Sequence, residues 1–303
     1  MSLDRIRLAS LHDKVISAEE ASAFIEDGMT VGMSGFTRAG EAKAVPLALV
    51  KRAHTNPLKI TLITGASLGN DLDKQLTEAG VLARRLPFQV DNTLRKAINN
   101  GEVMFIDQHL SETVEQMRNL QLKKPDVAII EAVAITEDGG IIPTTSVGNS
   151  ASFAIFAEKV IVEINTNLSP AFEGLHDIYI PTYRPTRQPI PLTQVDERIG
   201  THAINIDPAK IVGIVINNDL HDSPSTVTAP DDETQGIADH LIAFFEKEVA
   251  EERLPKNLGP LQAGIGSIAN AVLTGLKDSN FEDLVMYSEV LQDCTFELID
   301  AGK

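Results

Sequence analysis

Short apolar runs alternate with segments of helical character over the first 220 residues, and this alternation is what most restricts the fold. The apolar runs predict strands at residues 29–36, 59–65, 103–107, 126–135, 159–165 and 210–217. Predicted helices separate them, at residues 17–27, 44–53, from about 71, near 91–99, near 111–119 and at 150–157. Strands separated by helices favour an α/β fold with a mainly parallel sheet and flanking helices on both faces.

The composition excludes several classes of function. A net charge of −17 argues against nucleic acid or an anionic membrane surface as the main partner. The single cysteine, Cys294, excludes an intramolecular disulfide, and no Cys or His spacing predicts a metal site. The charged start, MSLDRIRLASLHDK, predicts no signal peptide, and the apolar runs are too short to span a bilayer. We therefore expect a soluble, cytoplasmic protein.

The chain also divides along its length. Residues 168–207 contain five prolines and predict an irregular excursion over the surface. We expect an N-terminal α/β domain at 1–220, a linker at 221–231 and the start of a second domain at 232–303. The second part opens with a predicted helix at 232–251, and one apolar stripe is expected on that helix: Ile237, Leu241, Phe244, Phe245 and Val249. About 70 residues with two strands cannot form a parallel sheet of their own, so this α/β domain is predicted to be incomplete. Either these elements complete the first domain, or the chain is part of something longer.

Three predicted strands run into glycine-rich or small polar loops, at residues 34–40, 65–69 and 144–150. Loops at the carboxyl ends of parallel strands share one edge of the sheet, so we expect them to line one cleft. A plainer interpretation is that these glycines serve only the tight turns between strands and helices.

The stretch at 258–290 carries the main chemical signal. It predicts a turn at Gly264 and Gly266, then a helix, then a strand that ends on Glu289. The apolar positions expected on one face of that helix are Ile268, Ala271, Val272 and Leu276. Backbone N–H groups at such a turn are expected to be free to bind an anion or a developing oxyanion. The hypothesis is acyl transfer with Glu289 as the nucleophile.

A rival interpretation is a nicotinamide dinucleotide site, because residues 264–269 match the G-x-G-x-x-G/A fingerprint and Glu289 follows about 25 residues on. The context disagrees: the fingerprint requires a buried apolar strand before the first glycine, whereas LGPLQA stands there. Pro260 cannot donate to a central strand ladder, and no second nucleotide-binding half follows. The remaining basic and imidazole groups that could meet a substrate are interpreted mainly as surface or structural residues: Arg84, Arg85, Arg95, Lys96, Arg184, Arg187, His109 and His176.

Longer strings of residues carry a family resemblance: SGFT at 34–37, ITGAS at 63–67, ITEDGGIIPTTSVGNS at 135–150, EGLHDI at 173–178, LQAGIGSIANAV at 261–272 and YSEVLQD at 287–293. Together they resemble the acetyl-CoA hydrolase/transferase family of class I CoA-transferases, and within it the succinyl-CoA:acetate CoA-transferases. The resemblance covers essentially the whole chain, in order, and implies the CoA-transferase-like (NagB/RpiA-like) fold.

The resemblance also implies site residues. Glu289 would be the covalent residue, and coenzyme A, a substrate rather than a prosthetic group, would contact Gly264, Ile265, Gly266, Ser267 and Ile268. The acyl and carboxylate pocket would be lined by Gly35, Phe36, Thr37, Gly65, Ala66, Ser67, Ser146, Val147, Gly148 and Asn149. A homodimer is implied as well. Family members continue past the position of Lys303, so the chain resembles a member without its C-terminal part. Cys294 stands where a glycine is common, and we expect the turn after Glu289 to differ slightly.

The chemistry agrees with the residue types. A carboxylate that attacks a thioester expels a thiolate, so the reaction needs no general base and no Ser-His-Asp or Cys-His set. The predicted function is transfer of coenzyme A between acetyl- or succinyl-CoA and a small carboxylate such as acetate. Two alternatives stay open: an acetyl-CoA hydrolase on the same site, and an inactive acyl-CoA-binding fragment that needs its missing half.

Overall fold

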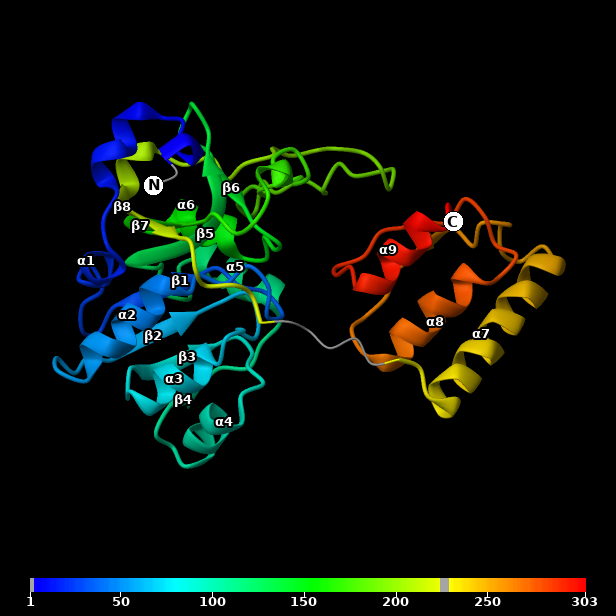
Figure 1. Cartoon of the computed structure of the whole chain (residues 1–303), viewed down its shortest axis with the longest axis horizontal. Coiled ribbons are helices and arrows are strands. Elements are labelled where there is room, and N and C mark those ends of the chain that lie inside the picture. Colours follow the sequence, from blue (N-terminus) through cyan, green and yellow to red (C-terminus); the bar gives the residue numbers. More distant parts are fainter. Residues whose placement is uncertain (1–2, 224–228) are drawn as a thin grey trace. The chain divides into compact units, whose positions relative to one another are not determined.

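The computed structural model describes residues 3–223 and 229–303, which form two compact units (Figure 1). The first unit comprises Met1–Ile190 and Arg198–Ser223, and the second comprises Pro191–Glu197 and Pro224–Lys303. Within the expected linker at 221–231, residues 224–228 lie outside the described residues.

An eight-stranded sheet forms the centre of the first unit. Seven strands follow the order β4-β3-β2-β1-β5-β7-β8 with parallel neighbours, and β6 pairs antiparallel with β5. Their bounds are β1 Thr30–Met33, β2 Ile60–Ile63, β3 Leu82–Leu86, β4 Met104–Phe105, β5 Val127–Ile135, β6 Ile141–Pro143, β7 Lys159–Asn165 and β8 Ile211–Asn217. The chain winds outward from β1 to β4 and then returns to place β5 beside β1. The strand order therefore reverses between β1 and β5, where open α/β sheets bind ligands.

Helices cover both faces of this sheet, as predicted. Their bounds are α1 Ala18–Ser22, α2 Ala44–Ala53, α3 Leu72–Glu78, α4 Asn92–Asn99, α5 Leu110–Arg118 and α6 Ser150–Phe156. Successive residues of a strand point to opposite faces. Accordingly, Val127 and Ile129 pack with α1 to α4, whereas Ala128 and Ile130 pack with α5 and α6. All nine residues of β5 are buried, so this strand lies at the centre of the core.

The mainly parallel α/β fold is confirmed, with some local errors. The strands β3 and β6 were not predicted, because β3 has two arginines at its centre and β6 has only three residues. The capping box at Ser17 and Glu20 is present as expected, but α1 ends at Ser22 instead of near residue 27. The Arg52 guanidinium donates hydrogen bonds to the carbonyl groups of Ser22 and Ile25, which satisfies backbone acceptors at this helix end.

The second unit contains the helices α7 Asp232–Ala250, α8 Ser267–Lys277 and α9 Asp293–Asp300. The strands β9 Pro260–Leu261 and β10 Val285–Met286 pair in parallel as a sheet of their own. Its small core includes buried Leu273 and Leu276 of α8 and Leu298 of α9. The expected two strands are therefore present, joined by α8 as a minimal β-α-β element.

Two apolar faces predicted for the second unit were partly wrong. On α7, the side chains that pack on the core are Ile242, Phe245 and Val249, whereas Ile237 and Phe244 are 41% and 51% exposed. On α8, Ile268 is 51% exposed and does not join the buried face. On both helices the predicted apolar stripe is wider than the face that packs on the core. Helical periodicity shows which side of a helix is apolar, but it does not locate the neighbouring element that covers it.

None of the helices in the described part of the chain is both long and apolar enough to cross a membrane.

Candidate active site

Glu289 lies three residues beyond β10, in a bend on the surface of the second unit, and its side chain is exposed. The predicted strand at 283–289 was too long, since β10 ends at Met286. Hydrogen bonds fix the bend. Tyr287 N–H donates to the Leu261 carbonyl at 2.9 Å, and the Ser288 hydroxyl lies 3.0 Å from the Ala263 carbonyl oxygen and 3.3 Å from the Ala263 nitrogen. Because Ala263 directly precedes Gly264, these bonds bring Glu289 beside the glycine turn.

The residues expected to contact coenzyme A form the turn into α8. All five are exposed: Gly264, Ile265, Gly266, Ser267 and Ile268. Gly266 is the N-cap residue at φ +124°, a conformation that favours glycine. The first N–H groups of a helix have no partner within the helix, and no side chain among the described residues caps α8. The turn therefore offers backbone donors and exposed apolar side chains together.

One donor is not free as expected. Gly266 N–H donates to Gln292 Oε1 at 3.1 Å, and Gln292 Nε2 donates to the Gly264 carbonyl at 2.9 Å. Gln292 therefore clamps the turn from the segment that follows Glu289. The sequence reasoning missed this residue, although its place within the string YSEVLQD was a signal.

Cys294 was expected to alter the turn after Glu289, but it lies within α9. Its side chain is buried, and Sγ donates to Asn270 Oδ1 of α8 at 3.3 Å. Burial raises the pKa of the thiol. Cys294 is therefore a packing residue between α8 and α9, and the bend itself lies at residues 287–292.

In the first unit, the three small-residue loops meet at the carboxyl edge of the sheet, as predicted. Arg38 N–H donates to the Ser67 carbonyl at 3.1 Å, which joins the loops at 34–40 and 65–69. The Ser146 hydroxyl donates to the Ala39 carbonyl at 2.8 Å, which joins the loop at 144–150 to the first loop. The loops follow β1, β2 and β6, so they adjoin the point where the strand order reverses.

Glycine is required where these loops touch. A Cβ atom on Gly65 would lie 2.6 Å from the Gly35 carbonyl oxygen, and Gly65 N–H donates to that oxygen at 3.1 Å. Gly148 has φ +47° and faces the Phe36 side chain, with 3.4 Å from its ideal Cβ position to Phe36 Cβ. The plainer interpretation, that the glycines serve only turns within one loop, is therefore incomplete, because they also allow one loop to approach another.

The other expected pocket residues lie on the same edge. Thr37 has φ +53° and lies in the turn closed by Phe36 and Ala39, and Ala66 accepts hydrogen bonds from Thr64 and Arg85. Val147 packs at the edge of the core, and its carbonyl accepts the N–H of Ser150. Asn149 is buried, with 8% of its surface exposed, and its Nδ2 has no hydrogen-bond partner among the described residues. A buried donor of this kind is available to bind an acceptor oxygen.

A buried charge cluster, which the sequence reasoning missed, lies beneath these loops. Lys43 Nζ donates to Glu131 Oε1 at 2.5 Å and to the Glu41 carbonyl at 2.7 Å, and it forms an ion pair with Asp222 Oδ1 at 2.6 Å. Burial raises the pKa of the Glu131 and Glu41 carboxyls. Burial would lower the pKa of Lys43, but the Glu131 and Asp222 carboxylates outweigh it and raise that pKa. The signal in the sequence was Glu131 itself, a charged residue inside a strand that is otherwise apolar.

Glu163 of β7 supports the start of α2. Its carboxylate accepts the N–H groups of Lys43, Ala44 and Val45 at 2.8, 2.9 and 3.1 Å. Burial raises the pKa of Glu163 against these hydrogen bonds, which lower it. The carboxylate therefore satisfies the N–H donors at the start of α2 and fixes the backbone of Lys43, the N-cap residue of this helix.

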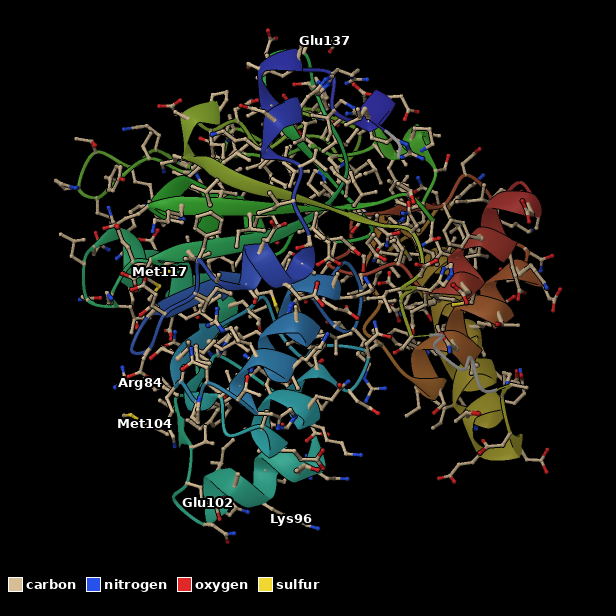
Figure 2. All side chains as sticks on the ribbon, turned by 60° about the vertical axis from the view of Figure 1, so that its left-hand side comes forward. Arg84, Lys96, Glu102, Met104, Met117 and Glu137 are labelled. Carbon is tan, nitrogen blue, oxygen red and sulfur yellow. The ribbon has the colours of Figure 1, made fainter. Side chains whose placement is uncertain are left out.

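The basic residues considered for coenzyme phosphates are dispersed. Figure 2 shows Arg84 and Lys96 toward the β4 edge of the sheet, where Arg84 Nε donates to Met104 Sδ at 3.2 Å. Arg85 is fully buried and pairs with Asp73 at 2.8 Å. Arg187 pairs with Glu115 at 2.8 Å. The structure therefore assembles two groups of expected site residues, one in each unit, and these arginines and Lys96 belong to neither. Within residues 3–223 and 229–303, no three His, Cys, Asp or Glu side chains are arranged to hold a metal ion.

The comparisons with known proteins agree with this architecture. The sheet and its reversal point define a doubly wound α/β protein, and the solved structures that it resembles include CoA-transferases. Residues 2–216 match the acetyl-CoA hydrolase/transferase N-terminal domain, and the chain belongs to the acetyl-CoA hydrolase/transferase family. The resemblance drawn from the sequence strings is thereby confirmed.

Two curated relatives show how far the similarity extends. The chain is 46% identical over 301 residues to the succinyl-CoA:acetate CoA-transferase of Clostridium kluyveri, covering 99% of this chain and 56% of the relative. It is 44% identical over 310 residues to the acetyl-CoA hydrolase of Kluyveromyces lactis, covering 99% of this chain and 59% of the relative. The chain thus spans less than two thirds of the length of these relatives, both of which are named as enzymes.

Solved structures support the fold. RipA from Yersinia pestis matches with a TM-score of 0.69 at 19% identity, covering 97% of this chain and 60% of RipA. The 4-hydroxybutyrate CoA-transferase from Porphyromonas gingivalis matches with a TM-score of 0.59 at 16% identity, covering 97% and 58%. At these identities the likeness extends to the fold alone.

Proposed function

We propose that this protein transfers coenzyme A between an acyl-CoA, such as acetyl- or succinyl-CoA, and a small carboxylate such as acetate. The observation that carries the proposal is the position of Glu289. Its exposed carboxylate follows Ser288, which is bonded to Ala263 at the start of the glycine turn, and the N-terminus of α8 supplies backbone donors beside it. The 46% identity to a succinyl-CoA:acetate CoA-transferase supports the choice of substrates.

In the proposed reaction, a Glu289 carboxylate oxygen attacks the thioester carbonyl of acyl-CoA and expels the coenzyme thiolate, which leaves an acyl-glutamyl anhydride. The thiolate then attacks the glutamyl carbonyl, forms a glutamyl-CoA thioester and releases the acyl group as a carboxylate. Acetate reverses both steps and leaves as acetyl-CoA. Since the nucleophiles and the leaving groups are thiolates and carboxylates, no step of the transfer requires a proton transfer or a general base.

Each tetrahedral intermediate carries a negative oxygen, and the donors proposed to stabilise it are the N–H groups at the start of α8. Losing one such donor typically slows acyl transfer about 10²–10³-fold. The exposed side chains of Ile265 and Ile268 are proposed to contact apolar parts of the coenzyme. Together with Gly264, Gly266 and Ser267 they form the proposed coenzyme A site.

The acyl and carboxylate groups are proposed to bind at the loop edge of the first unit. This edge adjoins the reversal point between β1 and β5, where open α/β sheets hold ligands. Asn149 Nδ2, buried without a partner among the described residues, is the proposed donor to a substrate oxygen. The N-terminal domain, residues 1–220, is proposed to carry the acyl pocket. Residues 232–303 are proposed to carry the nucleophile and the coenzyme A site.

Hydrolysis of acetyl-CoA on the same site is the second candidate, and the 44% identity to a named acetyl-CoA hydrolase favours it. The two activities share the glutamyl thioester and differ in whether water or a carboxylate attacks it. The homodimer implied by the resemblance and the cytoplasmic location expected from the composition stay part of the proposal.

The experiment measures coenzyme transfer by the 303-residue chain from acetyl-, propionyl- and succinyl-CoA, with acetate and with water alone. Dependence of product formation on acetate supports the transferase, and equal thioester loss in water supports the hydrolase. In either case Glu289→Gln must abolish turnover. Binding of acyl-CoA without turnover of any donor would contradict the proposal and favour the inactive acyl-CoA-binding fragment.

A further inference from the structure

We propose that Lys43 is a positioning residue, which ties the three loops of the first unit to Asp222 and Ser223, where the chain leaves for the unit that carries Glu289. The inference rests on the proposed function for its catalytic consequence, and on contacts within the first unit for its structural part. Lys43 touches none of the proposed pocket residues, so it would act through the groups that it holds.

The Lys43 ammonium group has three oxygen neighbours. It donates hydrogen bonds to Glu131 on β5 and to the backbone carbonyl of Glu41, in the segment that follows the first loop. It also forms an ion pair with Asp222 near the end of the first unit. The Lys43 side chain is 1% exposed and the Glu131 side chain is fully buried, so water does not compete for this pair. Breaking a buried pair by removing one partner is strongly destabilising, because the other charge is left unpaired. The geometry is therefore tightly held.

The Asp222–Ser223 pair contacts the third loop directly and the other two through the residues that follow them. Lys43, three residues after the first loop, pairs with the Asp222 carboxylate. Asn70, directly after the second loop, donates its N–H to Ser223 Oγ at 2.9 Å, and Ser223 Oγ donates to Asn70 Oδ1 at 3.1 Å. From the third loop, Thr145 Oγ1 donates to Asp222 Oδ2 at 3.4 Å. One short segment thus contacts one loop and the residues that anchor the ends of the other two.

The same network sets the loops relative to the sheet. Glu131 also accepts a hydrogen bond from Thr144 Oγ1 at 2.6 Å, and its N–H donates to Ser34 Oγ at 2.9 Å. Glu41, which is fully buried, accepts from Asn70 Nδ2 at 2.9 Å. The third loop is therefore bonded both to the cluster and to the departing segment, the first loop is bonded to the cluster through Ser34, and the second is followed by Asn70, which is bonded to both. A shift of Asp222 is expected to disturb these bonds.

The catalytic consequence follows from orientation. A mutation away from the reacting atoms that misplaces them by about 1 Å can cost about 10²-fold in rate. Since the proposed coenzyme contacts lie in the second unit, loosening the tether should lower kcat while the KM for acyl-CoA stays nearly constant. A residue with a purely structural role would instead lower the amount of folded protein and leave the kcat of the folded fraction unchanged.

The test compares Asp222→Asn with Asp126→Asn in the full chain. Asp126 also pairs with a lysine, Lys123, and accepts the backbone N–H of Thr30, but it lies at the opposite end of β5. Hydrogen–deuterium exchange should become about tenfold faster at 34–43, 65–71, 144–150 and 217–223 in Asp222→Asn, and in none of these segments in Asp126→Asn. Asp222→Glu, which keeps the charge, should restore most of the protection.

The kinetic arm uses the same proteins. Asp222→Asn should lower kcat about tenfold, with the KM for acyl-CoA changed less than about twofold, and Asp222→Glu should recover part of kcat. Unchanged exchange in the four segments, or a kcat equal to that of Asp126→Asn, would overturn the inference. Exchange that changes as expected in a chain whose parent forms no product supports the tether and contradicts the proposed function, so the two failures are distinguishable.

Discussion

The side-chain amide of Gln292 forms two hydrogen bonds with the turn around Gly266. Its Oε1 accepts the Gly266 N–H at 3.1 Å, and its Nε2 donates to the carbonyl of Gly264 at 2.9 Å. The segment that follows the proposed nucleophile therefore shapes the turn proposed to bind the coenzyme. A glycine turn with exposed residues has little packing to define it, so a single bidentate amide has a large share in its geometry.

Gln292→Ala should lower kcat/KM about tenfold, because the turn at 264–266 loses its fixed shape even though Gly266 N–H is released. Steady-state kinetics with acyl-CoA as the varied substrate measures the change. Gln235→Ala, at an exposed position of α7, is the matched control and should leave kcat/KM unchanged. An unaltered kcat/KM in Gln292→Ala would show that the clamp is irrelevant to coenzyme binding.

Glu163→Ala should lower the free energy of unfolding of the first unit by roughly 2–4 kcal/mol, because three N–H groups at the start of α2 lose their acceptor. Glu163→Gln retains one acceptor oxygen and should cost less. Scanning calorimetry, with the transitions of the two units analysed separately, provides the comparison. Equal losses in the two variants would mean that the acceptor oxygen retained by Gln gives this helix no support, which would contradict the expected order.

The burial of the Glu41 carboxyl leads us to expect that the stability of the first unit depends on pH. Burial raises the pKa of Glu41 above its ordinary value of 4.5, despite Lys43 and with help from Asp222 and Glu131. The native state therefore retains a proton that the unfolded chain releases. The stabilising contribution is complete below pH 4.5 and is lost as the pH rises through the native pKa.

Glu41→Gln removes this titration, so its melting temperature should fall less steeply than that of the parent as the pH rises above 4.5. The relevant quantity is the slope, since the buried amide changes stability at every pH by a constant amount. Glu158→Gln, at an exposed position, should retain the parental slope. Parallel curves for Glu41→Gln and the parent would contradict a proton held at Glu41.

Much of this molecule could be predicted from its sequence. Alternating apolar and helical segments identified six of the eight strands of the large sheet and the helices α1 to α6 of the first unit, and α2 was predicted with its observed bounds, Ala44–Ala53. The edge elements were harder. The strand β3 places Arg85 in the core, where Asp73 neutralises it, and a sequence pattern does not show that pairing in advance. The exposed Phe244 shows the converse, an apolar residue counted as core.

For the site, short strings located Glu289 and the glycine turn. Three loops were expected at one edge because parallel strands end there, and this reason holds for the loops after β1 and β2. The third loop reaches the edge because β6, which was not predicted, returns antiparallel to β5. The charge cluster was missed because Lys43, Glu131 and Asp222 are far apart in the sequence and belong to no motif. Only the return of β5 beside β1 brings Glu131 under the loops that follow β1 and β6. Such long-range polar contacts depend on tertiary structure that local patterns do not encode.

The most direct test of the account traps the covalent intermediate at Glu289. The chain is incubated with acetyl- or succinyl-CoA, treated with borohydride and analysed by peptide mass mapping, with Glu289→Gln as the control. A glutamyl-CoA thioester would be reduced to a primary alcohol on the peptide that contains Glu289, and only in the parent. Product formation by a chain that never carries this reduced residue would contradict covalent catalysis by Glu289.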